Sequence, residues 1–301
     1  MLQASMAAKG RLESPRPVLA MVISALCFSL MGVCVKQVGG RLPAAEVVLA
    51  RALISVVLSW WLLQRAGVSP WGQRRGLLVW RGAIGSVALL CVYVALAELP
   101  LATATVLQYL YPTCTALLAW LVLGERFGAR LLLALGLGWS GVLLVSQSVA
   151  RSGAGLAFST WPVLVAVIGA LGTALAYVSV RALSRSEHPL VIVFYFPLVA
   201  VPLSLPWVVL NPVLPTLIEL VWLLGVGLFT QLGQMMLTYS LEALPAARAT
   251  AISYVQVVFA GLWGWLLFGE GLDGWTIAGA ALVLAATLLS LSHRRTGLTS
   301  R

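Results

Sequence analysis

The sequence predicts an all-α polytopic membrane protein with ten transmembrane helices in two inverted five-helix repeats. Three observations lead to this expectation: the composition, ten long apolar segments and an internal duplication. Of the 301 residues, 61% are hydrophobic and only 9% are charged, whereas a soluble domain carries about 25% charged residues. Because such a chain cannot present a polar surface all round, we expect the lipid bilayer to be its solvent.

Ten apolar segments are long enough to cross about 30 Å of hydrocarbon at about 1.5 Å per residue. They cover residues 17–37, 44–64, 77–97, 101–123, 129–149, 160–181, 189–209, 218–239, 247–268 and 274–292. Short connectors with Gly and Pro separate them, and no linker indicates a soluble domain. We therefore expect a cytoplasmic tail over 1–16, a first repeat over 17–149, a second repeat over 160–292 and a cytoplasmic tail over 293–301.

The stretch 100–125 recurs 145 residues later, at 245–270. Between 96–125 and 241–270, 12 of 30 aligned positions are identical, whereas chance would give about 3 in so apolar a composition. The matched residues of the first copy are Leu96, Leu99, Pro100, Ala102, Ala104, Thr105, Tyr109, Leu117, Trp120, Leu121, Gly124 and Glu125. The shared Pro, Tyr, Trp and Gly-Glu in one register indicate a duplication, because Leu and Ala content alone would not produce them.

The positions of the charges predict the orientation of the chain. The net charge is +10, but the basic residues lie between apolar runs and form no patch, so we expect no nucleic-acid partner. With the N-terminus in the cytoplasm, fifteen of the 19 basic residues, Arg81 among them, fall on the inner side. We therefore expect both termini to be cytoplasmic.

Five helices per copy is an odd number, so the two copies should have opposite orientations in the membrane. Inverted repeats that exchange conformations open a central site first to one side and then to the other. The duplication therefore favours transport by alternating access.

The repeated Pro-to-Gly-Glu helices, the ten segments and the length near 300 residues resemble the drug/metabolite transporter superfamily, EamA type. The likeness covers residues 17–293, and Pro112 also fits the family's pattern in the fourth helix. Val257 stands at the equivalent position of the second copy, and Phe196 stands where the first copy has Arg51. The resemblance implies a 5+5 inverted-repeat transporter of the inner or plasma membrane, often an exporter of amino acids or other small metabolites.

Polar residues gather near the middle of the two repeated helices. Tyr109 and Tyr254 lie nine residues beyond Pro100 and Pro245, about 13 Å along a helix and so close to the midplane. The other polar residues at this level are Gln108, Tyr111, Ser253 and Gln256. Buried amides and hydroxyls need partners, so this set either lines a substrate cavity or forms hydrogen bonds between helices.

Three further groups are candidates. Gln231 and Gln234 share one face of the eighth segment, where they either bind substrate or join helices by hydrogen bonds. Tyr93 and Tyr177 are candidates for the same cavity, with aromatic packing as the alternative. Pro112 should interrupt the helix around Gln108 and free a backbone carbonyl near the midplane.

The charged candidates are gating residues. Glu46 and Arg51 share one predicted span, and Arg51 lies about 10 Å deep, where it pairs, extends outward or meets an anionic substrate. Glu125 and Glu270 end equivalent helices, where a carboxylate opposes the helix dipole and needs a partner from the other half. Lys36 and Arg181 end the first and sixth segments, again 145 residues apart.

These observations favour a secondary transporter that exports an amino acid or a similar polar or aromatic solute, with protons as a candidate coupling ion. Two alternatives stay open: a membrane enzyme acting on a lipid-linked substrate and a passive channel. The enzyme would need clustered Asp, His or Glu at an interface, and only Glu187 and His188 come near this requirement. The four cysteines lie in apolar runs without a CxxC pair, and the two histidines lie at segment ends. We therefore expect no metal site, disulfide or cofactor.

Overall fold

The computed structural model describes residues 16–39, 41–98, 107–125, 128–150, 160–210, 212–268 and 274–291. Within these ranges all regular structure is helical, as the sequence predicts, and no strand occurs. The helices are α2 (Arg16–Val38), α3 (Ala44–Ala66), α4 (Arg75–Glu98), α6 (Tyr111–Leu123), α7 (Ala129–Ala150), α8 (Thr160–Leu183), α9 (Pro189–Leu210), α10 (Leu217–Ala243), α11 (Ala246–Ile252), α12 (Val255–Phe268) and α13 (Gly274–Leu291).

Seven helical stretches of the described chain are long and apolar enough to cross a membrane, with α11 and α12 taken together as one of them. Helices α6, α7 and α13 supply shorter apolar stretches, Tyr111–Leu123, Ala129–Leu144 and Ile277–Leu289. The outer surface of the bundle is strongly apolar, and Val57 of α3, Leu121 of α6, Val221 of α10 and Leu288 of α13 are all exposed. Such a surface suits contact with lipid, because a helix satisfies its own backbone hydrogen bonds and needs no water.

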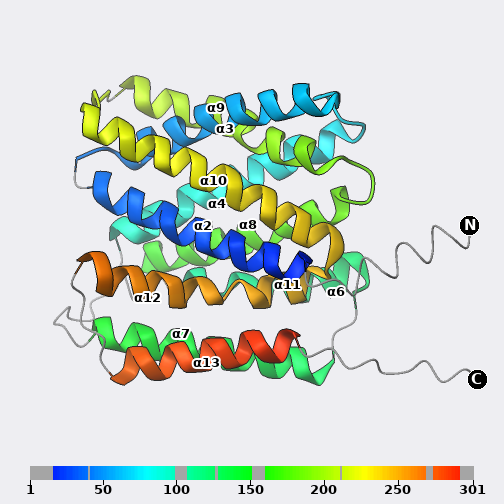
Figure 1. Ribbon diagram of the computed structural model, residues 1–301, viewed down its shortest axis with the longest axis vertical. Helices are drawn as coiled ribbons and strands as arrows, with labels where there is room; N and C mark the ends of the chain where they lie inside the picture. Colours follow the sequence, from blue (N-terminus) through cyan, green and yellow to red (C-terminus); the bar gives the residue numbers. More distant parts are fainter. Residues whose placement is uncertain are drawn as a thin grey trace, which may run out of the picture.

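The helices lie side by side, with α3 and α9 at one end of the long axis and α7 and α13 at the other (Figure 1). The closest pairs are α2 with α10, α4 with α8, α3 with α9, and α7 with α13. The middle of the molecule is therefore made by α2, α4, α8 and α10, and α6, α11 and α12 lie between this group and the α7–α13 pair.

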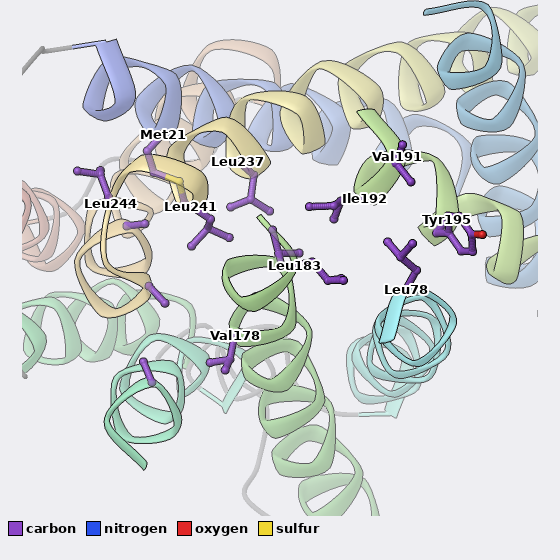
Figure 2. Close-up of a cluster of buried hydrophobic side chains, with 14 of the residues drawn as sticks. Met21, Leu78, Val178, Leu183, Val191, Ile192, Tyr195, Leu237, Leu241 and Leu244 are labelled. Atoms are coloured by element: carbon purple, nitrogen blue, oxygen red, sulfur yellow. The ribbon is translucent and has the colours of Figure 1, made fainter. Parts of the chain in front are cut away.

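One apolar core joins helices from both halves of the sequence. Leu183 of α8, Ile192 of α9 and Leu237 of α10 have no exposed surface and lie close together in the cluster of Figure 2. Met21 of α2 and Leu78 of α4 belong to the same cluster. Close packing thus holds together helices that are far apart in sequence. In a membrane this packing matters because lipid is as apolar as the core, so the hydrophobic effect does not drive helices together.

Local sequence sets several helix ends. Gly67 and Gly124 follow α3 and α6 with φ of 63° and 65°, a left-handed conformation that glycine adopts at low cost. Thr216 and Glu219 form a capping box at the start of α10, in which each side chain satisfies a backbone N–H of the first turn.

Both repeated helices are interrupted near their middle. Residues 109–110 form a turn before α6, with Pro112 in the first turn of that helix. The segment expected over 247–268 matches the candidate span Ala246–Leu267, but a turn at 253–254 divides it into α11 and α12. Here the N–H groups of Gln256 and Val257 bond to carbonyls three residues back, at 3.0 Å each, so the backbone tightens locally without a proline.

Candidate functional site

A cavity of about 150 Å³ lies between the central helices. Its walls come from α2, α3, α4, α6, α8, α9, α10, α12 and the segment before α6. The lining residues are Phe28, Met31, Arg51, Arg81, Gly85, Ala88, Leu89, Val92, Gln108, Tyr109, Tyr111, Thr173, Ala176, Tyr177, Phe196, Gln234 and Gln256. A cavity of this size has room for a molecule about as large as benzene.

Seven of the candidate residues meet at this cavity although they come from six different parts of the chain. They are Arg51, Gln108, Tyr109, Tyr111, Tyr177, Gln234 and Gln256. Amide, hydroxyl and guanidinium groups therefore share one concave wall with aromatic rings. Such a mixture is typical of small-molecule sites, in which a few polar groups orient a ligand inside an apolar pocket.

Ser253 and Tyr254 do not line the cavity but support its wall from behind. The Tyr254 ring has no exposed surface and stacks on Tyr109, with 5.8 Å between ring centroids and 21° between planes. Ser253 Oγ donates to the carbonyl of Thr250 at 2.6 Å and is hydrogen-bonded to the Tyr111 hydroxyl. The second repeat thus fixes two cavity-lining tyrosines of the first.

The tyrosine wall continues onto α8. Tyr111 meets Tyr177 edge to face, with 5.4 Å between centroids and 84° between planes. Edge-to-face pairs of this kind are favourable because the positive ring edge meets the negative ring face. The side chain of Tyr93, the other candidate tyrosine, lies outside the described part of the chain.

Arg81 is a cavity residue that the sequence does not single out. The sequence places it among the inner-side charges, but it is only 2% exposed and lines the cavity. Its Nη2 donates to Gln234 Oε1 at 3.3 Å, and its Cζ lies 4.4 Å from the centroid of the Phe196 ring. Arginine has a long side chain, so its position near the start of α4 does not determine whether the charge points to the membrane surface or inward.

Arg51 approaches the same aromatic ring from α3. Its Cζ lies 5.4 Å from the Phe196 centroid, and the side chain is 5% exposed. Both guanidinium groups are within the distance at which a cation is attracted to an aromatic face. The site therefore concentrates two positive charges at one phenylalanine.

Gln231 does not reach the large cavity. Its Nε2 donates to Ser59 Oγ of α3 at 2.8 Å, which supports the helix-joining interpretation for this residue. Gln231 lines a smaller cavity of about 10 Å³ together with Arg51, Ser55 and Thr230. This space suits a single water, since the hydroxyls of Ser55 and Thr230 lack protein partners.

Glu125 joins the two repeats at one end of the bundle. Its Oε1 accepts from Arg181 Nε at 3.0 Å, and its Oε2 accepts from the N–H of Ala246 at 2.9 Å. Arg181 also donates to the carbonyls of Leu241 and Glu242, at 2.9 and 2.6 Å. The carboxylate at this helix C-terminus thus has a cation and a backbone donor, both from the second repeat. Glu270, its counterpart, lies outside the described residues.

Other contacts between the halves occur at the opposite end. Arg41 forms an ion pair with Glu219, with Nε 2.8 Å from Oε1, and this hydrogen bond raises the pKa of the Arg41 guanidinium. Glu46 Oε1 accepts from the N–H of Val213, and its Oε2 has no hydrogen-bond partner. Glu46 and Lys36, in the last turn of α2, are not among the lining residues of the central cavity.

Glu187 has a structural position. Its Oε1 accepts the N–H groups of Gln73, at 2.8 Å, and of Arg74, directly before α4 begins. A carboxylate there satisfies donors that the first turn of a helix leaves free. Within the described ranges no group of three or more His, Cys, Asp or Glu side chains could hold a metal ion.

Phe196, Arg81 and Phe28 are the principal lining residues that sequence reasoning did not select. Phe196 had a signal, because it stands 145 residues after Arg51, at the equivalent position of the second repeat. Nothing in the sequence distinguishes Phe28 from other apolar residues of the first segment.

Comparisons with known proteins agree with this description. The EamA-like transporter family matches the chain twice, over residues 15–147 and 160–292. The pseudopaline exporter of Pseudomonas aeruginosa strain UCBPP-PA14 is 34% identical over 281 residues, covering 93% of this chain and 97% of the exporter. Human solute carrier family 35 member G1 is 27% identical, covering 89% of this chain and 76% of that protein. A protein of known crystal structure superposes with a TM-score of 0.81 at 20% identity, over 91% of this chain and 96% of that one.

Proposed function

Because the chain belongs to the EamA-like transporter family, we propose that it is a secondary transporter that exports a small organic solute across the cytoplasmic membrane. The solute is an amino acid or a similar polar or aromatic compound. It moves by alternating access between two inverted five-helix halves, with both chain termini in the cytoplasm and protons as the coupling ion. Export is favoured by the likeness to the pseudopaline exporter, which resembles the chain over nearly its whole length.

The observation that carries this proposal is the cavity shared by the two repeats. Gln108 and Tyr111 of the first repeat face it together with Tyr177 and Gln234 of the second. Substrate sites of inverted-repeat transporters lie at such an interface, because only there does a rearrangement of the halves change access to the site.

Contacts between equivalent residues support a two-fold relation between the repeats, which the inverted arrangement requires. Tyr109 stacks on Tyr254, and Arg51 lies 5.4 Å from the ring of Phe196; the members of each pair are 145 residues apart. Two copies related by a two-fold axis bring equivalent residues into contact only close to that axis. Inverted repeats require such an axis in the plane of the membrane.

The packing of the helices has the same symmetry. Exchanging each helix for its counterpart turns the α2–α10 contact into the α8–α4 contact, and the α2–α12 contact into the α8–α6 contact. Helices α3 and α9 are counterparts that pack on each other, as are α7 and α13. This pattern supports two structurally equivalent halves.

Transport is tested with the full chain in proteoliposomes and a panel of radiolabelled polar and aromatic amino acids, with and without an imposed pH gradient. We expect at least one solute to accumulate with the gradient and to be released by a protonophore. Tyr109→Ala should abolish accumulation, whereas Trp207→Ala, at an exposed position, should not. Gradient-independent equilibration that is unchanged in Tyr109→Ala would contradict the proposal.

The inverted topology is tested by single cysteines at Gly128 and Gly274, in a chain whose four native cysteines are replaced. Both glycines have open space where a Cβ would lie, and they precede or begin equivalent helices, α7 and α13. We expect a membrane-impermeant maleimide to label them from opposite sides of the membrane. Labelling of both from one side would disprove the inversion.

A further inference from the structure

We infer that the central cavity binds the carboxylate group of its solute. Arg81 is the principal residue that contacts the carboxylate, and Arg51 and Gln234 lie beside it. This inference rests on the proposed transport function and adds the chemical class of the solute, an organic acid or a zwitterion held by its carboxylate.

The hydrogen-bonding state of Arg81 is the first step. A guanidinium has five N–H donors in a planar fork. Arg81 is 2% exposed, and Nη2 reaches Gln234 Oε1 at 3.3 Å, but buried Nε and Nη1 have no hydrogen-bond partner. A buried cation with unused donors is costly unless an anion satisfies it, so the arrangement is suited to an anionic ligand.

The charge balance of the cavity is the second step. Arg51 and Arg81 both line it, and the described lining residues include neither Asp nor Glu. Charged side chains at membrane depth mark substrate sites when they face a cavity between helices. A cationic solute would be repelled here, whereas a solute carboxylate would compensate the charge.

The geometry around Arg81 is the third step, because it holds the fork in place. On the α9 side, the Cζ of Arg81 lies 4.4 Å from the centroid of the Phe196 ring. On its own helix, a Cβ at Gly85 would lie only 3.2 Å from Arg81 Nη1 and 3.1 Å from the Phe196 ring. A side chain larger than glycine would press on both groups at this position. The close packing of the guanidinium positions it before a ligand arrives, as a planar two-point contact with carboxylate requires.

The rest of the cavity fits the organic part of such a solute. Tyr109, Tyr111, Tyr177 and Phe196 supply aromatic walls, and the volume of about 150 Å³ limits the enclosed part to roughly the size of benzene. Inorganic anions would gain nothing from these walls.

The test is ligand binding by the purified full chain in detergent, measured by thermal unfolding and calorimetry, so that it needs no transport. Probes are benzoate with its neutral amide benzamide, butanoate with butanamide, and inorganic phosphate. We expect at least one carboxylate to raise the melting temperature with concentration, while its amide and phosphate do not. Arg81→Gln should weaken carboxylate binding by about ten- to hundredfold.

Arg65→Gln is the matched control. Arg65 is an exposed arginine over the Trp61 ring, at 4.0 Å from its centroid, so its loss removes the same charge and kind of ring contact outside the cavity. Binding should be unchanged in this variant. Without ligand, Arg81→Gln should be at least as stable as the natural chain, because it removes an uncompensated buried charge; a structural role for Arg81 would instead lower stability.

The outcomes separate this inference from the transport proposal. Amides or phosphate that bind as well as the acids, carboxylate binding unaffected by Arg81→Gln, or no binding of any acid would overturn the inference. Arg81-dependent carboxylate binding without transport in proteoliposomes would leave the carboxylate site standing and overturn transport. Transport of a solute at a rate that Arg81→Gln leaves unchanged would support the transport proposal and overturn the carboxylate site.

Discussion

The stacked pair Tyr109 and Tyr254 shows how a fully buried residue shapes a cavity that it does not touch. Tyr254 fills the space behind Tyr109, and its hydroxyl donates a long hydrogen bond, 3.5 Å, to the Tyr109 carbonyl and is also hydrogen-bonded to the Thr113 side chain. Most of its contribution should therefore come from packing of the ring, and little from the hydroxyl.

Two substitutions separate these contributions. Tyr254→Ala should lower the free energy of unfolding by about 3 kcal/mol, because truncating a large buried ring leaves a cavity. Tyr254→Phe should lower it by less than about 1 kcal/mol, the usual worth of a neutral hydrogen bond. Unfolding in detergent, followed by circular dichroism, measures both values. Equal losses in the two variants would assign the contribution to the hydroxyl instead.

At this scale the sequence predicts which residue types form the site better than which way each side chain points. Gln231 and Gln234 are expected on one helix face, yet Gln231 reaches Ser59 and Gln234 reaches Arg81. Three residues along a helix differ by about 60° around its axis, enough to face different neighbours. The sequence also gives no indication that Arg81 faces the cavity, because a flexible stem lets one backbone position direct the charge either way.

At the scale of elements, the interruptions at 109–110 and 253–254 show where sequence signals end. Pro112 signals the first break, since proline removes a backbone donor. The second break has no comparable signal in the sequence, because Val257 stands where the first repeat has Pro112. It places Tyr254 against α7, where a Cβ at Gly138 would lie 2.7 Å from the Tyr254 ring, so a glycine on another helix makes this conformation possible.

This contact gives a prediction with a control on the same helix. Gly138→Ala should displace the Tyr254 ring and lower the melting temperature, because the clash is with a ring confined by the core. Gly136→Ala should be neutral or slightly stabilising, since nothing lies within 4 Å of its added Cβ and alanine favours helix by about 1 kcal/mol over glycine. Thermal unfolding of the two variants in parallel measures the difference. A melting temperature of Gly138→Ala equal to that of Gly136→Ala would show that the ring is free to move.

At the scale of the whole molecule, ion pairs join the repeats at both ends of the bundle. Glu125 and Arg181 meet where α8 and α10 end, and Arg41 and Glu219 meet where α10 begins. Under the proposed topology the first pair is cytoplasmic and the second faces outward. With both pairs formed, the two repeats are joined on either side of the central cavity. Weakening one pair should therefore favour a conformation in which the cavity opens at that end.

The expected consequence is a directional change in access to the cavity. With a single cysteine at Gln108, Glu125→Gln should speed labelling by a membrane-impermeant maleimide from the cytoplasmic side, and Arg41→Gln should speed it from outside. The ion pair of Glu125 is largely buried, so its loss should change the labelling rate about fivefold, equivalent to about 1 kcal/mol. The Arg41 pair is more exposed, and the effect of its loss should be smaller.

Inside-out and right-side-out vesicles give the two labelling rates, and Arg65→Gln again serves as the charge-matched control. Faster labelling from both sides in either variant would mean that the pairs stabilise the fold as a whole and do not control opposite ends of one pathway.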